Sequence, residues 1–308
     1  MSKMEYLKNL PVAVLGGGAV GKTCAADIKL AGREVRLYDV MPFAEKSLKD
    51  LDKTGILFDG IQRNRDCFER SGRAFIDVVT TDIEKAIKGA GHIVVSCGSW
   101  GHEAMFRAMI PYLEDGQVVN VFADNFGALL LRRLMREMGC TKKVIVGGWS
   151  SAPYGTRLES IGKCVFPHVS AKYRAITLRG AALPMTDTDD FLEASKYLPC
   201  MDAVTNGDGP SKANTILDVD FANVNPVIHV PATILGVSTM ENWGVIFGGH
   251  DKTTYSMYSH GLCPSICEVQ YQFYNEEIAL AEAIGVGTPK YKKEMFFSRR
   301  SVLTQEYM

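Results

Sequence analysis

The sequence has no apolar run long enough to cross a bilayer, and residues 1–8 have no signal-peptide core. Internal repeats and low-complexity segments are also missing, which excludes repeat architectures and collagen-like chains. We therefore expect a cytoplasmic protein with no membrane partner.

Neither sign of charge is in excess. The 308 residues include 34 basic and 35 acidic side chains, and the basic ones form no dense run. Nucleic acids and anionic membrane surfaces attract strongly basic patches, so we expect neither as a partner.

The eight cysteines contain no C-x-x-C pair and mostly lie in apolar segments, which is typical of reduced core residues. Cys263 and Cys267 share a helical face with His260 nearby, but structural zinc normally takes four ligands at tighter spacing. We expect no bound metal.

The chain does have a glycine-rich turn between a short apolar run and a helix-compatible stretch, in the segment Pro11-Val-Ala-Val-Leu-Gly16-Gly17-Gly18-Ala19-Val20-Gly21. In a dinucleotide fingerprint, Gly16 permits the tight turn, Gly18 leaves room for a pyrophosphate, and Gly21 lets the helix pack closely on the strand. The free N–H groups of the helix start, around Ala19 and Val20, then face the phosphates. This pattern predicts a dinucleotide-binding loop.

A second strand, Glu34–Asp39, ends in an acid at the spacing that this fingerprint requires. Asp39 would accept hydrogen bonds from the adenosine ribose, and its charge would repel a 2′-phosphate. We therefore expect NAD, as NADH in preference to NADPH, although Arg36 and Lys46 could alter that preference.

Strand-like and helix-like segments alternate beyond Asp39, which predicts an α/β fold with an N-terminal Rossmann, doubly wound parallel sheet. The expected strands are 74–80, 92–97, 117–122, 143–147, 163–169 and 173–178, and the expected helices are 82–88, 102–113, 126–138 and 190–197. After the breaker cluster Asn206–Pro210 the β-alternation stops. We expect a dinucleotide-binding domain over 1–205 and an all-helical substrate domain over 206–308, with a long helix from Pro264 to Gly285.

Three segments have side chains suited to chemistry. The loop Ser96–His102 follows a sheet strand, so Cys97 and Gly98 are expected near the cofactor, and His102 either contacts substrate or caps the next helix. Arg157 could bind a substrate carboxylate or form an ion pair. His229, in the segment Asn223–Pro231 with Asn225 one turn earlier, is either a proton donor or a buried structural histidine.

With these motifs the whole chain resembles the opine dehydrogenases, the NAD/NADP octopine and nopaline dehydrogenase family. The most specific match is Asn223-x-Asn225-Pro-x-x-His229, and further matches are Pro153-Tyr-x-x-Arg157, Tyr258-x-x-Gly261-x-x-Pro264 and Ala283-Ile-Gly285. The resemblance implies that His229 is catalytic. It also implies NADH-dependent reduction of the imine formed from a 2-oxo acid and an amino acid, a reaction on a CH–NH group.

The sequence also departs from the family pattern. An aspartate usually partners the histidine, and the resemblance places Asn275, followed by Glu276, at that position, so that one of them would orient the ring of His229. An amide can orient an imidazole but cannot stabilise an imidazolium by charge. Family members normally continue beyond the position of Met308, so we expect either a piece of a longer protein or a shortened branch.

Two other functions fit the same architecture. One is a 2-oxo acid or ketone reductase of the 6-phosphogluconate-dehydrogenase-like group, and the other is a regulator that senses NADH without turnover. Aromatic positions in the helical domain, Tyr255, Tyr258 and Phe273, fit either the interface of a homodimer or a core.

Overall fold

The computed structural model describes residues 2–60, 70–159, 167–248 and 254–298. The chain forms two compact units, Met1–Asp220 and Phe221–Tyr307, and each is considered by itself.

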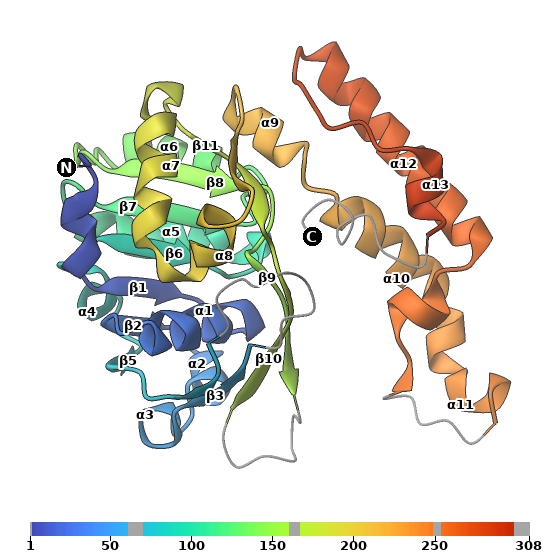
Figure 1. Cartoon of the computed structure of the whole chain (residues 1–308), viewed down its shortest axis with the longest axis horizontal. Coiled ribbons are helices and arrows are strands. Elements are labelled where there is room, and N and C mark those ends of the chain that lie inside the picture. The colour runs from blue at the N-terminus through green and yellow to red at the C-terminus, as the bar shows by residue number, and fades with distance from the viewer. Residues whose placement is uncertain (1, 61–69, 160–166, 249–253, 299–308) are drawn as a thin grey trace. The chain divides into compact units, whose positions relative to one another are not determined.

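The described part of the first unit contains an eight-stranded sheet in the order β12-β11-β8-β7-β6-β1-β2-β5 (Figure 1). From β5 through β8 all neighbouring strands run parallel. In chain order this gives the Rossmann arrangement 3-2-1-4-5-6, so the predicted doubly wound sheet is confirmed. The strands are β1 (Val12–Leu15), β2 (Val35–Tyr38), β5 (Val78–Thr80), β6 (His92–Val95), β7 (Val118–Phe122), β8 (Ile145–Trp149), β11 (Thr177–Ala182) and β12 (Gly209–Lys212).

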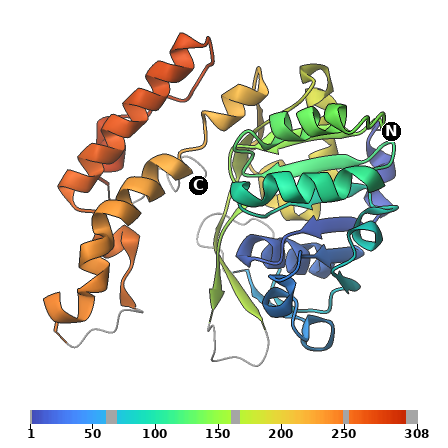
Figure 2. The same ribbon diagram turned by 180° about the vertical axis from the view of Figure 1, so that it is seen from behind.

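Helices cover both faces of this sheet, as Figures 1 and 2 show from opposite sides. The face seen in Figure 2 is covered by α5 and α6, whose apolar stripes pack on buried residues of β1, β6 and β7. Asp82 caps the neighbouring helix α4 by accepting hydrogen bonds from the N–H groups of Glu84 and Lys85. The helices of this unit are α1 (Ala19–Leu30), α2 (Ala44–Ser47), α3 (Leu51–Thr54), α4 (Ile83–Ile87), α5 (His102–Met109), α6 (Gly127–Glu137), α7 (Thr188–Ala194), α8 (Asp202–Thr205) and α9 (Ile216–Asp220).

A second, four-stranded sheet among the described residues was not predicted. Its order is β4-β3-β10-β9, formed by β3 (Ile56–Asp59), β4 (Gly72–Ala74), β9 (Tyr154–Glu159) and β10 (His168–Arg174). The middle of α1 is joined to it by Asp27, which is fully buried and accepts hydrogen bonds from Arg174 at 2.9 and 3.0 Å. Arg70 donates to the same carboxylate at 2.7 Å, and Tyr154 also donates to it. A buried carboxylate with two guanidinium partners is paired and hydrogen-bonded, as burial of its charge requires.

The structure corrects some sequence-based boundaries. The single strand expected over 74–80 is two strands in different sheets, separated by Asp77, whose carboxylate accepts the N–H of Val35. The strands expected over 163–169 and 173–178 are replaced, in the described residues, by β10 and β11, and residues 163–166 lie outside them.

The breaker cluster Asn206–Pro210 leads into the edge strand β12, which pairs in parallel with β11. The compact units accordingly divide between Asp220 and Phe221 rather than between 205 and 206. Gly209 and Pro210 are compatible with a strand there because an edge position leaves one side without ladder bonds.

The described second unit is helical, with α10 (Asn225–Glu241), α11 (Trp243–Ile246), a π-helical turn (Met257–Gly261), α12 (Pro264–Ala283) and α13 (Lys293–Phe296). The predicted long helix is confirmed. Pro264 is its first residue, and Gly285 follows its end at a φ of 75°. Its buried Gln270 donates from Nε2 to the main-chain oxygen of Ile228 at 2.7 Å, which fixes α12 against α10.

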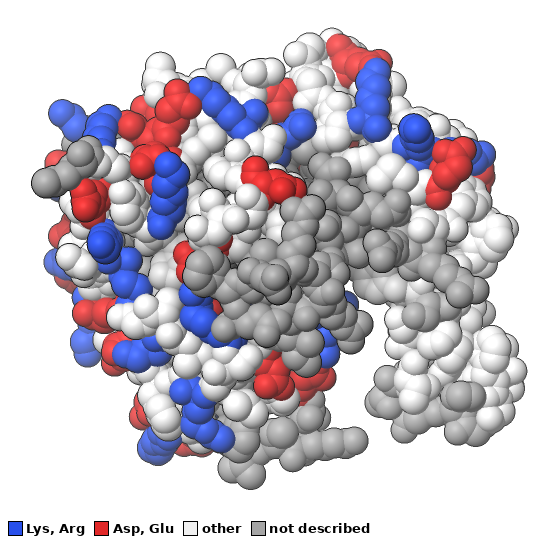
Figure 3. Space-filling model, in the orientation of Figure 1, with Lys and Arg blue, Asp and Glu red and all other residues white. Residues whose placement is uncertain are grey.

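No described helix is long and apolar enough to span a membrane. On the face shown in Figure 3, Lys and Arg are interspersed with Asp and Glu over the first unit. In the second unit, the described residues at the end that contains α11 show no charged side chain on that face.

Candidate functional site

The glycine loop between β1 and α1 has the geometry that its sequence predicts. Gly16 adopts a φ of 114°, which a residue with a side chain rarely adopts. A Cβ atom on Gly21 would lie 1.8 Å from the main-chain oxygen of Gly16, so any side chain there would force α1 away from the loop. Gly18 is the N-cap residue of α1, and a Cβ built on it meets no atom within 4 Å.

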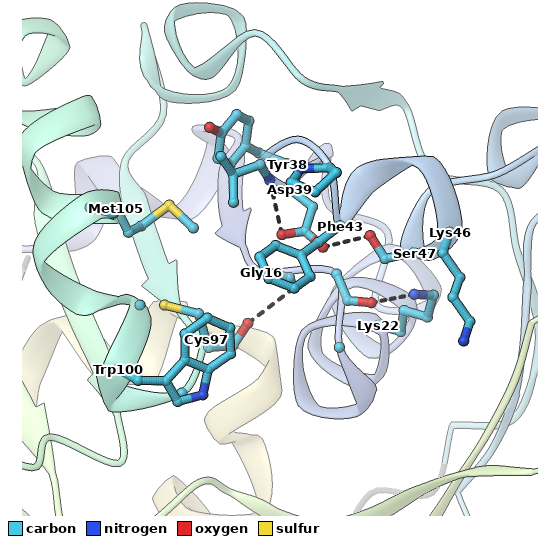
Figure 4. Close-up of a pocket in the computed structure, with 18 of the residues that line it drawn as sticks. Gly16, Lys22, Tyr38, Asp39, Phe43, Lys46, Ser47, Cys97, Trp100 and Met105 are labelled. Carbon is cyan, nitrogen blue, oxygen red and sulfur yellow. Dashed lines mark hydrogen bonds between the residues drawn. The ribbon is translucent and has the colours of Figure 1, made fainter.

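The loop borders a cavity of about 740 Å³ in the first unit (Figure 4). Asp39 at the end of β2 lines it, and so do Cys97 and Gly98 after β6. Ligands of open α/β sheets bind at this edge, beyond the carboxyl ends of the strands. Ala19 and Val20 do not line the cavity themselves; they form the half-buried first turn of α1, directly after the Gly18 cap.

Asp39 is held in a fixed position. One carboxylate oxygen accepts the N–H of Val40 at 3.0 Å, and the other accepts the hydroxyl of Ser47 on α2. The side chain is 8% exposed, so bulk water screens its charge only weakly. A carboxylate held in this way suits the recognition of a ribose diol.

Lys22 is a cavity residue that the sequence analysis missed. It is 4% exposed, and its ammonium group donates to the main-chain oxygen of Gly17 (Figure 4). Burial lowers its pKa to about 8, while the charge of Asp39 acts in the opposite direction. A signal for it was present in the sequence, since Gly16-x-x-x-x-Gly21-Lys22-Thr23 has the spacing of a phosphate-binding lysine loop.

Two aromatic side chains also line the cavity. The rings of Phe43 and Trp100 lie 5.7 Å apart, and 52% and 79% of these residues is exposed. Met105 lines the same cavity (Figure 4). An exposed aromatic surface at a cavity suits a flat ring such as adenine.

Cys97 and His102 are both uncharged near neutral pH. Burial raises the pKa of the Cys97 thiol to about 11, so the thiol is neutral near pH 7. His102 is the first residue of α5, is 1% exposed and packs on Phe106 with ring centroids 5.1 Å apart. Burial lowers its pKa, and the cavity lining does not include it.

Arg157 lies on β9 with an exposed side chain, and its Nη1 donates to the main-chain oxygen of Thr156 at 3.0 Å. The cavity lining includes its neighbour Leu158 but not Arg157.

In the second unit, His229 lies one turn into α10 and is half-buried. Its Nδ1 lies 2.9 Å from the main-chain oxygen of Asn225, and its Nε2 lies 2.6 Å from the hydroxyl of Tyr258. The side chain of Asn225 donates to Oδ1 of Asn223 at 2.6 Å, which fixes the helix start. The ring is therefore oriented at both nitrogens.

The hydrogen bonds to His229 come from Asn225 and Tyr258, whereas Asn275 or Glu276 was expected to orient the ring. Asn275 is half-buried and Glu276 exposed on α12, on the side where Gln272 bonds Glu268 at 2.9 Å. Sequence spacing could not point to Tyr258 in this role, because this partner comes from a turn 29 residues along the chain.

Two buried acids meet where β7 ends and α9 ends. Asp124 is 1% exposed and accepts the N–H of Ala128 at 2.9 Å; Asp220 is 6% exposed and accepts the N–H of Phe126 at 2.7 Å. Burial raises the pKa of Asp124 well above its ordinary value, and the adjacent carboxyl of Asp220 raises it further. Burial also raises the pKa of Asp220, to about 6. The pair therefore holds at least one proton in mildly acidic solution.

Among the described residues no group of three or more His, Cys, Asp or Glu side chains could hold a metal ion. His260 instead packs on Trp243 with ring centroids 4.4 Å apart, and Cys263 is exposed, unlike the core residue expected.

Comparisons with known proteins point to the octopine and nopaline dehydrogenases. Residues 212–305 match the family model described as NAD/NADP octopine/nopaline dehydrogenase, alpha-helical domain. An opine dehydrogenase of Arthrobacter sp. (strain 1C) is 28% identical over 280 residues, which cover 90% of this chain and 68% of that protein.

Solved structures give the same picture of the fold. Octopine dehydrogenase with NADH and L-arginine matches with a TM-score of 0.63 and 22% identity, over 90% of this chain and 64% of that one. Yersinopine dehydrogenase with bound NADP+ matches with a TM-score of 0.67 and 15% identity, over 94% of this chain and 68% of that one. The chain thus spans about two thirds of the length of these relatives.

The Rossmann sheet, the glycine loop and the acid at the end of β2 are the features of a dinucleotide-binding domain. The C-terminal segment matches the helical domain of octopine and nopaline dehydrogenases, and the resemblance to this family that the motifs predict is confirmed.

Proposed function

We propose that this protein is an NADH-dependent dehydrogenase acting on a CH–NH group, which reduces the imine formed from a 2-oxo acid and an amino acid. The observation on which the proposal mainly depends is His229, held at both ring nitrogens within the segment that matches the octopine dehydrogenase helical domain. An oriented imidazole is suited to proton transfer near neutral pH.

The donor set of the cavity fits a dinucleotide. Gly18 leaves open space at the start of α1, Lys22 supplies a cation, and Asp39 supplies an acceptor for a ribose. When bound, the reduced nicotinamide supplies the hydride that the imine carbon accepts. The part of the protein in this proposal is to bind the two substrates, exclude water and supply a proton through His229.

NADH is the proposed cofactor in preference to NADPH. A 2′-phosphate beside Asp39 would meet a weakly screened negative charge. Lys22 and Lys46 line the same cavity and act in the opposite sense, and Ser47 occupies one oxygen of Asp39. Direct titration of NADH and NADPH decides the matter, and equal dissociation constants would contradict this preference.

The proposed substrate contact is Arg157, whose exposed guanidinium could bind a carboxylate bidentately. Asn225 is proposed to position the substrate or the ring of His229. A contact between substrate and His102 stays a prediction, and it would require this buried ring to turn outward.

The test is an NADH-consumption screen that crosses pyruvate and related 2-oxo acids with a panel of amino acids. We expect oxidation only when both substrates are present. A 2-oxo acid that alone consumes NADH at the full rate would show a ketone reductase instead. Tight NADH binding without turnover across the panel would favour the regulator.

The matched variant is His229→Ala. We expect turnover to fall by about 10²- to 10⁴-fold, the usual effect of a general acid or base. NADH affinity should not change, because the cavity is lined entirely by residues of the first unit. Undiminished turnover would remove His229 from the mechanism.

A cytoplasmic location and a homodimer are also proposed. The described cysteines are all free thiols, which fits a reducing compartment. Exposed apolar side chains on α10, among them Val230, Ile234 and Val237, favour self-association. Light scattering of the purified chain measures the mass, and a monomer at micromolar concentration would contradict the dimer.

A further inference from the structure

The hydrogen bonds of His229 define which nitrogen has the proton. A main-chain oxygen can only accept, so Nδ1 must donate to Asn225. In the neutral ring Nε2 is then an acceptor, and the hydroxyl of Tyr258 donates to it. In the charged ring Nε2–H donates to the tyrosine oxygen, and the hydroxyl proton is directed elsewhere.

The segment with Tyr258 is fixed against α10. The ring of Tyr258 meets that of His229 edge-on, at an interplanar angle of 80°. The neighbouring Tyr255 hydroxyl occupies the space where side chains on Gly236 and Gly261 would lie, at 3.0 and 2.4 Å from their Cβ positions. Glycine at both positions thus lets the turn lie close to α10.

Both ring nitrogens face groups of the protein. Nδ1 points along its own helix, and Nε2 points to Tyr258. A proton held on Nε2 therefore leaves the ring through the tyrosine hydroxyl. The hydroxyl can pass it on, because it accepts at one lone pair while it donates from its own O–H.

We propose that Tyr258 and His229 form a proton relay in which the tyrosine hydroxyl donates directly to the substrate. This proposal rests on the proposed imine reduction. In the transfer, the O–H bond of Tyr258 breaks and the imine nitrogen gains that proton, while the imine carbon gains the hydride. At the same time Tyr258 takes the Nε2 proton of the imidazolium. His229 is left neutral with Nδ1–H on Asn225, and solvent returns one proton by the reverse path.

The first test needs no turnover. With ¹³Cζ-labelled tyrosine in the full chain, the Tyr258 resonance is followed by NMR while the ring of His229 is titrated. We expect both groups to change through one common midpoint, and the Tyr258 change to vanish in His229→Gln. Independent midpoints would overturn the relay, whatever the substrate is.

The second test uses Tyr258→Phe, which removes only the hydroxyl, with Tyr255→Phe from the same segment as the matched control. We expect kcat of Tyr258→Phe to fall about 10²- to 10⁴-fold, with its pH profile altered, while an unchanged helical circular dichroism signal reports that the second unit is folded. Tyr255→Phe should stay within about threefold of the parent.

The outcomes separate the two proposals. Full turnover in Tyr258→Phe together with loss of turnover in His229→Ala would refute the relay and leave the proposed function standing. Absence of imine reduction in the parent would refute the proposed function, and the NMR experiment would still decide whether the two side chains exchange a proton.

Discussion

Replacing Asp124 by Asn should make the protein more stable at neutral pH and change how its stability depends on pH. The native state holds a proton on the buried pair Asp124 and Asp220 that the unfolded chain has released, because burial raises the pKa of both acids. A raised acid pKa contributes stability at low pH that is lost as pH rises toward the folded pKa. Each pH unit in that range costs about 1.4 kcal/mol per retained proton.

The asparagine removes one of these titrations. Its Oδ1 can keep the hydrogen bond from Ala128, and its amide can donate to Asp220 in place of the acid proton. We expect the free energy of unfolding to decline between pH 4.5 and 6 by about 1.4 kcal/mol per pH unit less than in the parent. By pH 7 the variant should therefore be more stable than the parent.

Urea unfolding at several pH values measures this slope, with fluorescence of the fully buried Trp149 as a probe of the first unit. The control is Asp189→Asn on α7, where the carboxylate is 78% exposed and pairs with Lys212, so its slope should match the parent. Parallel stability curves for the parent and Asp124→Asn would refute the reasoning, since they would show that the pair holds no extra proton.

Three further predictions concern the cavity. NADH affinity should weaken as pH rises from 7 to 9, because Lys22 loses its proton with a pKa of about 8, and Lys22→Met should abolish this dependence in fluorescence titrations. Gly21→Ala should lower Tm and eliminate NADH binding in calorimetry, since its Cβ would lie 1.8 Å from the oxygen of Gly16; wild-type affinity would contradict the close packing. Asp39→Ser should raise the NADPH to NADH affinity ratio by about tenfold or more, and an unchanged ratio would show that the carboxylate does not set the preference.

The parallel sheet could be predicted because its evidence is local. Each strand is a short apolar run followed by a helix, and the glycine loop indicates where the first crossover begins. The four-stranded sheet could not be predicted in this way. Its strands β3 and β10 pair across more than 100 residues of chain. Residues 75–77 separate β4 from β5, and Asp77 accepts a hydrogen bond from the N–H of Val35.

The edge strand β12 shows a similar limit. Gly209 and Pro210 are breakers by composition, and only pairing with β11 makes them a strand. In the helical unit, the sequence pointed to His229 but not to its partner Tyr258. The reason is that the π-helical turn determines which side chain reaches the ring nitrogen. The spacing of Lys22 from Gly16 and Gly21 indicates a phosphate-binding lysine. The same glycines also fit the dinucleotide fingerprint, which does not include the lysine.

Asp27 connects the four-stranded sheet to the helix that follows the glycine loop. The residue lies midway along the helix that begins at the glycine loop, and its two arginine partners lie on β10 and just before β4. The helix cannot slide or tilt without breaking buried charge pairs, so the phosphate-facing loop is braced from behind. Substitutions in those remote strands would then weaken coenzyme binding, even where every residue that contacts the coenzyme is unchanged.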